Sequence, residues 1–325
     1  MKAVIWTRYG PPESLVVRNQ DKPRPRAGQV LIRNAVANIF AGDAELRRFQ
    51  INGLFWLPVR LAVGLFKPRV KILGQEFAGT VEEVGAGVTD FAPGDRVFAP
   101  TGIGGAYAEF LCQKTSLLTR IPEGVSFSDA ACLSVGGTNA LHFLRVAEVK
   151  AGDRVLLNGA GGSIGTLAIQ LAKIMGAEVT VVDSSRKLGT LLWLGADHVL
   201  DYREDDFTAH ASVYDVIIDI VGGASYKGCL RALQPGGRLV LGNAPTAQMF
   251  RRLWSRWATD RKVRIALAGY EKADLEYLAG LLGEGKIKPV IERSYTIDQI
   301  VEAHRYLETG RKIGNVLLAL PVDGA

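Results

Sequence analysis

A glycine-rich segment carries the clearest chemical signal in the chain. Its glycines Gly159, Gly162 and Gly165 separate a short apolar run from a helix-forming run. A turn that opens a helix brings backbone N–H groups and the positive end of the helix dipole together, which suits a pyrophosphate. Glycine is needed there because a Cβ would block the tight turn and the approach of a phosphate. The spacing departs from the strict G-x-G-x-x-G pattern, since Ile164 stands where the third glycine of that pattern belongs.

An acidic residue follows the next predicted strand, residues 178–182. Asp183 in this place is suited to bind the adenine ribose hydroxyls and would repel a 2′-phosphate, which favours NAD. Ser184, Arg186 and Lys187 offer hydrogen bonds and positive charge for that phosphate, which favours NADPH. The alternative is that the two basic residues only decorate an exposed helix start. The local sequence therefore favours NADPH and leaves NAD open.

The elements that must position these residues alternate between strand and helix. Strands are expected at residues 154–158, 178–182, 213–220, 238–241 and 262–266, with helices at 165–175 and 185–194. This alternation predicts a doubly wound parallel sheet of the Rossmann type, in the α/β class. Before about residue 130, short apolar runs broken by Gly, Pro and Asp predict a β-rich domain. Later elements are expected to return to that first domain, at residues 273–282, 298–307 and 315–320.

Composition narrows the class of protein further. A chain of 325 residues with 48% hydrophobic residues indicates a globular protein of two domains. Its longest apolar stretch, residues 54–66, is interrupted by Pro58 and Arg60 and is too short to span a membrane. The amino terminus does not match a signal peptide, so we expect a cytoplasmic protein with reduced cysteines. The net charge of +6 suits a phosphate-bearing cofactor, and no nucleic-acid motif accompanies it.

Several ordered segments resemble the medium-chain dehydrogenase/reductase family, and within it the zinc-free quinone-reductase-like branch. Besides the glycine loop, they are G-Q-E-F-A-G-T-V at residues 74–81, F-x-P-G-D-R-V at 91–97, G-A-Y-A-E at 105–109 and L-G-A-D-H-V-L-D-Y at 194–202. The resemblance implies a GroES-like β-rich substrate domain at residues 1–132 and 268–325. It also implies a Rossmann domain at 133–267 and a homodimer.

The same resemblance implies which residues bind the cofactor. Lys187 matches a phosphate-binding lysine of NADPH-dependent quinone reductases, and Tyr202 resembles the tyrosine that flanks the 2′-phosphate there. The expected cofactor-binding set is Thr138, Gly159, Gly162, Ser163, Ile164, Gly165, Asp183, Ser184, Arg186, Lys187, Tyr202, Val221 and Asn243.

Zinc separates the branches of this family. Zinc-dependent members would have Cys at the position of Phe40, His at Gln75 and Cys near Cys132. A catalytic zinc needs three protein ligands, and a single thiol cannot hold it. The sequence therefore predicts no metal site, and Cys132 is interpreted as a small apolar residue that lines the interdomain hinge.

The substrate site is implied to include Asn38, Phe40, Asp43, Trp56 and Ser134. Zinc-free quinone reductases usually carry Asn where Phe40 stands, so the anchor for the substrate oxygen is missing there. Asn38 either replaces that anchor or satisfies a turn, and Asp43 either serves the site or caps the helix that follows it. The sequence identifies no catalytic proton donor.

Without a Lewis acid, positioning and hydrogen-bond donors must drive hydride transfer, which favours activated acceptors such as quinones, enones and other activated carbonyls. An alcohol dehydrogenase or aldehyde reductase of the same fold is an alternative, and so is a catalytically silent dinucleotide-binding protein. Residues 54–61 and 249–257 mix aromatic residues with arginines. Each segment fits a substrate lid, a dimer interface or a membrane contact.

Overall fold

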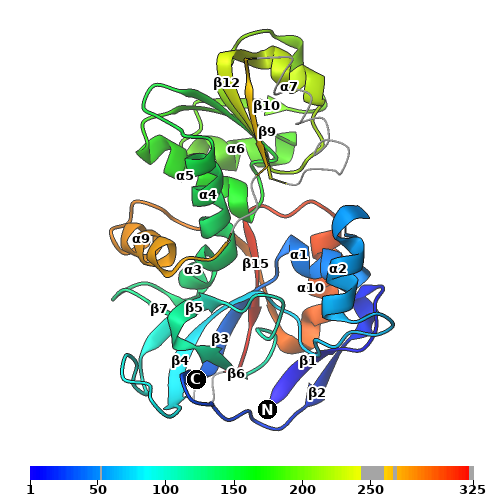
Figure 1. The fold of residues 1–325 in the computed structure, drawn as a ribbon, viewed down its shortest axis with the longest axis vertical. Coiled ribbons are helices and arrows are strands. Elements are labelled where there is room, and N and C mark those ends of the chain that lie inside the picture. Colours follow the sequence, from blue (N-terminus) through cyan, green and yellow to red (C-terminus); the bar gives the residue numbers. More distant parts are fainter. Residues whose placement is uncertain (52, 243–259, 266–268, 322–325) are drawn as a thin grey trace. The chain divides into compact units, whose positions relative to one another are not determined.

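The chain folds into two compact units, each with a sheet of its own (Figure 1). The computed structural model describes residues 1–51, 53–242, 260–265 and 269–321. Unit 1 comprises Met1–Val135 and Tyr270–Ala325, and unit 2 comprises Gly136–Gly269. The boundaries expected from sequence, after residues 132 and 267, lie within a few residues of these.

Unit 2 contains a parallel sheet in the order β10-β9-β8-β11-β12-β13. This order runs outward in both directions from the first strand, as in the Rossmann fold, so the predicted α/β class is confirmed. Its strands are β8 (Arg154–Asn158), β9 (Glu178–Asp183), β10 (His198–Asp201), β11 (Tyr214–Asp219), β12 (Leu233–Leu241) and β13 (Lys262–Ile265). Its helices are α4 (Thr138–Val146), α5 (Ser163–Ile174), α6 (Ser185–Trp193), α7 (Tyr226–Ala232) and the short 3-10 turn Phe207–Ala209.

The central strands of unit 2 are apolar because helices and neighbouring strands enclose them. Val155, Leu156 and Leu157 of β8 are fully buried, as are Val216 and Ile217 of β11. Continuous apolar runs of this kind are typical of parallel strands that are covered on both faces. The polar residues that follow such runs lie at the carboxyl edge of the sheet, where ligands bind in this fold.

Unit 1 contains the β-rich GroES-like domain expected from the sequence. Its larger sheet has the order β14-β15-β3-β4-β5-β7, and β6 also pairs with β3; β1 and β2 form a separate pair. The strands are β1 (Lys2–Trp6), β2 (Leu15–Asn19), β3 (Gln29–Asn38), β4 (Glu76–Val84), β5 (Arg96–Pro100), β6 (Phe110–Lys114), β7 (Thr119–Arg120), β14 (Ile291–Thr296) and β15 (Asn315–Ala319). The helices are α1 (Ala41–Arg48), α2 (Gly53–Val63), α3 (Phe127–Ala131), α9 (Lys272–Gly283) and α10 (Ile300–Glu308), with short helical turns at Pro12–Ser14, Thr115–Leu117, Leu133–Gly137 and Ile297–Gln299.

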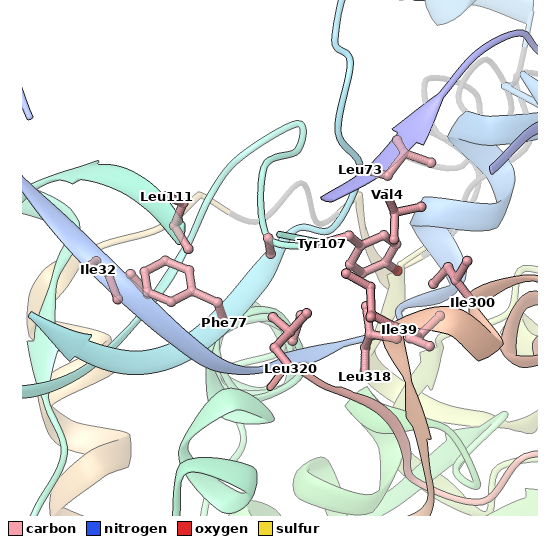
Figure 2. Close-up of a cluster of buried hydrophobic side chains, with 14 of the residues drawn as sticks. Val4, Ile32, Ile39, Leu73, Phe77, Tyr107, Leu111, Ile300, Leu318 and Leu320 are labelled. Atoms are coloured by element: carbon pink, nitrogen blue, oxygen red, sulfur yellow. The ribbon is translucent and has the colours of Figure 1, made fainter. Parts of the chain in front are cut away.

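The core of unit 1 joins segments that are far apart in the chain. Figure 2 shows Tyr107 among Val4, Ile39 and Ile300, and all four side chains are almost completely buried. The last strand, β15, pairs antiparallel with the end of β3, with Leu317 opposite Asn38. This pairing brings the carboxyl-terminal part of the chain beside the start of α1, where the candidate substrate residues lie.

Candidate functional site

The glycine loop connects β8 to α5, and its glycines differ in what a side chain would meet there. Gly159 has a φ of 82°, and a Cβ there would lie 2.4 Å from Val221 Cγ1. A Cβ on Gly165 would lie 2.3 Å from the carbonyl oxygen of Ala160. These two glycines are therefore required by the protein's own packing.

Gly162 differs from its neighbours in the loop. Its φ of −92° is open to any residue, and a Cβ built on it meets no described atom within 4 Å. It is the residue that precedes α5, whose first residues Ser163 and Ile164 are buried and half-buried. Glycine at this position keeps space free at the start of a helix, and a phosphate group fits such a cradle.

Asp183 lies at the end of β9 and organises the loop. Its carboxylate accepts the N–H of Gly161 at 2.7 Å and that of Ser184 at 2.8 Å. Lys187 Nζ lies 3.0 Å from Asp183 Oδ1, and a Cβ on Gly161 would lie 2.3 Å from Lys187 Cδ. The lysine stem thus packs on the glycine loop while its ammonium group pairs with Asp183. A bound ribose hydroxyl or 2′-phosphate would therefore compete with the existing bonds of Asp183 and Lys187.

The other predicted cofactor residues differ in exposure. Tyr202 and Val221 are each 56% exposed, and Arg186 is exposed as well. Thr138, the first residue of α4, is buried. Asn243 lies outside the described residues. The structure thus places Gly159 against Val221, and Gly161 against Asp183 and Lys187.

Two polar residues at the same edge escaped the sequence analysis. Asn158 ends β8 and donates to the carboxylate of Asp219, which ends β11, at 2.9 Å. Asp219 also accepts the N–H of Gly222 at 3.0 Å and that of Ala224 at 3.3 Å. Asp219 therefore fixes the loop that carries Val221. The available signal was a polar residue directly after a buried apolar run, in two neighbouring strands.

In unit 1, Asp43 is a buried acceptor in the first turn of α1. The sequence left two alternatives, a role in the site or the N-cap of a helix from residue 44; the second is wrong in position, because α1 begins at Ala41. Its carboxylate accepts the N–H of Phe40 at 3.0 Å, the hydroxyl of Tyr107 at 2.8 Å and the amide of Gln75 at 3.3 Å. Burial raises the pKa of Asp43 to about 6 in spite of these donors.

Asn38 belongs to a second buried group at the end of β3, so it does not serve a turn. Its amide nitrogen lies 2.7 Å from Glu76 Oε1 and 2.8 Å from Asn315 Oδ1. The other oxygen of Glu76 accepts the N–H of Val135 at 2.7 Å. Burial, with a smaller contribution from nearby Asp43, raises the pKa of Glu76 to about 8. Glu76 is therefore a carboxyl group that is largely neutral near pH 7.

The remaining predicted substrate residues differ in exposure. Phe40 is half-buried, Ser134 is completely buried in the turn Leu133–Gly137, and Trp56 is 43% exposed. Trp56 packs edge-on against Phe49, with ring centroids 5.6 Å apart.

Of the two aromatic and basic segments, residues 54–61 form part of α2. The guanidinium of Arg60 lies over the rings of Tyr9, at 3.7 Å, and Phe49, at 4.3 Å. This arginine therefore contacts its own unit. Residues 249–257 lie outside the described residues.

The residues at the family's zinc positions do not fit a zinc ion. Phe40 has no donor atom, and Gln75 offers an amide already bound to Asp43. The Cys132 thiol donates to the carbonyl oxygen of Ser128 at 3.2 Å, and burial raises its pKa well above the ordinary value. In the part of the chain that the structure describes, no group of three His, Cys, Asp or Glu side chains is arranged to hold a metal.

His304 is a further buried polar group that the sequence did not reveal. It lies on α10, is completely buried, and its ring is edge-on to Tyr107 with centroids 5.9 Å apart. Neither ring nitrogen has a hydrogen-bond partner among the described residues. Burial, with a smaller contribution from nearby Arg47, lowers its pKa to about 3, so the imidazole is neutral at physiological pH.

A Rossmann sheet with an open glycine cradle, together with a GroES-like domain, defines a dinucleotide-dependent oxidoreductase of two domains. Comparison with known families agrees with this class. The profile described as "Alcohol dehydrogenase GroES-like domain" matches residues 26–123, and the one described as "Zinc-binding dehydrogenase" matches residues 194–318. The chain belongs to the medium-chain dehydrogenase/reductase family, and within it is quinone-reductase-like. It is an NAD(P)H-dependent enzyme.

Individual relatives cover nearly the whole chain. It is 30% identical to an acryloyl-coenzyme A reductase of Metallosphaera sedula, over 98% of this chain and 99% of that protein. A quinone oxidoreductase of Pseudomonas aeruginosa is 29% identical over the same shares. The solved quinone oxidoreductase of Coxiella burnetii superimposes with a TM-score of 0.88 at 31% identity, covering 99% of both chains.

No helix in residues 1–51, 53–242, 260–265 and 269–321 is both long and apolar enough to cross a membrane. The homodimer and the cytoplasmic location expected from the sequence stay predictions.

Proposed function

We propose that the protein uses NADPH to reduce conjugated carbonyl compounds, such as enones and quinones, without a catalytic zinc. Bound NADPH supplies a hydride; the protein's own residues hold the pyrophosphate, orient the acceptor and bind its oxygen. The two substrates named by the relatives, acryloyl-coenzyme A and a quinone, are both conjugated carbonyl compounds. That shared chemistry supports the substrate class.

The observation that carries the zinc-free part of the proposal is the chemistry of the side chains at the family's zinc positions. Phe40 has no donor atom, and the amide of Gln75 is bound to Asp43. Cys132 alone cannot supply the three protein ligands that a catalytic zinc needs.

The test is a reduction assay with purified enzyme, both cofactors, and a panel of quinones, enones, saturated aldehydes and alcohols. We expect turnover of the conjugated acceptors that persists after chelation and dialysis, with less than one zinc per chain by elemental analysis. Activity that is lost on chelation and restored by zinc would overturn the zinc-free reading. Tight cofactor binding with no hydride transfer to any acceptor would show a catalytically silent protein instead.

The preference for NADPH is tested at the end of β9. Lys187→Met keeps the stem that packs on Gly161 but removes the charge, and Arg186→Ala removes an exposed charge. We expect each to weaken NADPH binding by roughly 1.5–3 kcal/mol and to leave NADH binding nearly unchanged. Dissociation constants for both cofactors at fixed salt check this. Unchanged NADPH/NADH ratios in both variants would assign the enzyme to NAD, with Asp183 on the ribose.

A further inference from the structure

A hollow of about 410 Å³ lies in unit 1, between α1, α2 and the loop at Gly102 and Ile103. Its volume is within the range of small-molecule sites. Most of its wall is apolar, with Leu46 on α1 and Val59 on α2 among the lining residues. None of the five substrate residues expected from the sequence lines it. The hollow is therefore a candidate site that the sequence did not indicate.

Gln75 is the half-buried polar side chain in this wall. The other polar side chain, Glu45, is exposed at the hollow's rim. Gln75 Nε2 donates to Asp43 Oδ1 at 3.3 Å, and a Cβ built on Gly42 would lie 3.0 Å from the same nitrogen. Gly42 also lines the hollow. The amide nitrogen therefore lies against a bare Cα at the wall of an apolar space.

The orientation of this amide is determined by its neighbours. Asp43 is completely buried, and Tyr107 and Phe40 already donate to its other oxygen. A carboxylate accepts and cannot donate, so the nitrogen of Gln75, and not its oxygen, must face Asp43. A primary amide has two N–H groups. One is used by Asp43, which leaves a second donor on an atom next to the hollow.

We propose that Gln75 donates this second N–H to the carbonyl oxygen of a substrate whose apolar substituent occupies the hollow. The inference rests on the proposed reduction of conjugated carbonyls. When such a substrate accepts a hydride with its electron pair, electrons move onto the carbonyl oxygen, and a proton from water later neutralises it. A fixed N–H donor stabilises that charge as it develops. Asp43 and Tyr107 act as positioning residues, since Asp43 holds the amide and Tyr107 holds Asp43.

The binding test needs no cofactor. Cyclohex-2-enone and methylenecyclohexane are similar in size, but only the first has an oxygen that accepts a hydrogen bond. Ligand-observed NMR measures their affinities for the whole protein. We expect Gln75→Met to weaken cyclohex-2-enone by about three- to tenfold and to leave methylenecyclohexane unchanged. Val59→Ala, the matched change in the apolar wall, should weaken both probes equally. An unchanged ratio of the two affinities in Gln75→Met would overturn the inference.

A second variant guards against a folding effect. Gly42→Ala leaves Gln75 in place, but its methyl group presses on Nε2 at 3.0 Å, so we expect a smaller loss of affinity for cyclohex-2-enone in the same direction. With NADPH, Gln75→Met should lower kcat by about 10²-fold with a smaller effect on KM. If wild-type protein reduces no carbonyl, the proposed function fails while the affinity ratio still tests the hollow. If it turns over and the ratio and kcat stay unchanged in Gln75→Met, only the role of Gln75 fails.

Discussion

The two units hold their carboxyl groups in different ways. In unit 2, Asp201 and Asp219 end strands, and backbone N–H groups donate to them from the loops that follow and, for Asp201, also from the start of α6. The N–H of Arg203 lowers the pKa of Asp201. In unit 1, Asp43 and Glu76 are enclosed by side chains and backbone from distant segments, and burial raises their pKa to about 6 and about 8.

The difference follows from what replaces water around the charge. Backbone N–H groups at a strand end are fixed donors that stabilise an anion, whereas an enclosed carboxyl group loses its hydration and favours the neutral form. Unit 2 therefore builds its candidate site from backbone conformation and glycine. Unit 1 builds its site from side-chain chemistry. Substitutions that alter shape should be most damaging in the first, and substitutions that alter titration should be most visible in the second.

The largest effect is expected from shape in the glycine loop. Gly165→Val places a branched side chain against backbone atoms of Ala160 at 2.3 Å, which neither partner can relieve by rotation. We expect a loss above about 3 kcal/mol in the free energy of unfolding of unit 2. Denaturant unfolding followed by circular dichroism measures it.

Gly162→Val is the matched control in the same loop. Its side chain enters open space at an ordinary φ, so the fold should survive while cofactor affinity collapses. Tight NADPH binding by a folded Gly162→Val protein would contradict the proposal that this loop binds the pyrophosphate. Equal destabilisation by the two valines would contradict the distinction between packing glycines and the open cradle.

The second largest effect is expected from titration in unit 1. A carboxyl group whose pKa rises on folding contributes stability below its unfolded value, and this is lost as pH rises through the folded value. For Glu76 that window runs from 4.5 to about 8. Within this window, ionisation of Glu76 should lower the free energy of unfolding by about 1.4 kcal/mol for each unit that the pH rises.

Glu76→Gln removes the titration and isolates this contribution. The new amide meets the N–H donors of Asn38 and Val135 badly, which costs about 1–3 kcal/mol at every pH. Its stability relative to wild type should nevertheless improve by about 3 kcal/mol from pH 5 to pH 7. Urea unfolding of both proteins at several pH values gives the difference. Parallel curves would mean that Glu76 is solvated, as the strand-end carboxylates are.

The same contrast explains which parts of the site could be predicted from the sequence. The glycine loop and Asp183 lie within 25 residues of each other on successive elements, and their spacing is set by the strand and helix that join them. Asp43 contacts Gln75 and Tyr107, which are 32 and 64 residues away. Local sequence patterns do not predict such contacts, because the tertiary fold of unit 1 brings these distant segments together.

Resemblance to a family also fails to predict the roles of residues whose surroundings depend on the tertiary fold. The resemblance to the family singled out Gln75 only as a missing zinc ligand, and Glu76 only as part of a matching segment. Their roles as an oriented donor beside a hollow and as a neutral carboxyl follow from burial, which depends on the whole of unit 1.

A third, smaller effect concerns His304. Folding lowers its pKa from 6.5 to about 3, so the unfolded chain binds a proton in that window that the folded chain does not. Stability should therefore fall as pH decreases below 6.5, by about 1.4 kcal/mol per pH unit from this residue. His304→Leu should flatten that decrease, by about 2 kcal/mol at pH 5, with little change at pH 7.5. Thermal or urea unfolding across this range checks it, and an unchanged slope would place the ring in contact with water.

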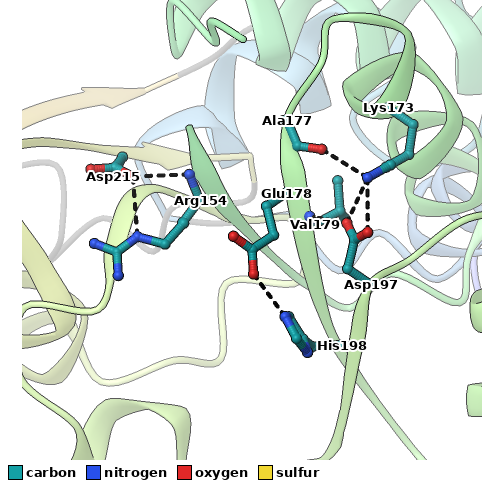
Figure 3. A network of polar contacts seen from close by, with 8 residues as sticks. All are labelled: Arg154, Lys173, Ala177, Glu178, Val179, Asp197, His198 and Asp215. Carbon is teal, nitrogen blue, oxygen red and sulfur yellow. Dashed lines mark hydrogen bonds and ion pairs between the residues drawn. The ribbon is translucent and has the colours of Figure 1, made fainter. Parts of the chain in front are cut away.

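The smallest effect is expected at the exposed edge of unit 2, where Figure 3 shows polar pairs at the strand starts. Glu178 and His198 interact at 2.8 Å, but their side chains are 49% and 59% exposed. Water competes for both groups, so a double-mutant cycle of Glu178→Gln and His198→Asn should give a coupling below about 0.5 kcal/mol.

Lys173 is less exposed, and it donates to the carbonyl oxygen of Ala177 and to both oxygens of Asp197. Lys173→Met should therefore lower the free energy of unfolding by up to about 1 kcal/mol. A coupling above about 1 kcal/mol between Glu178 and His198 would break the comparison, because exposed pairs of unit 2 would then contribute as strongly as the buried groups of unit 1.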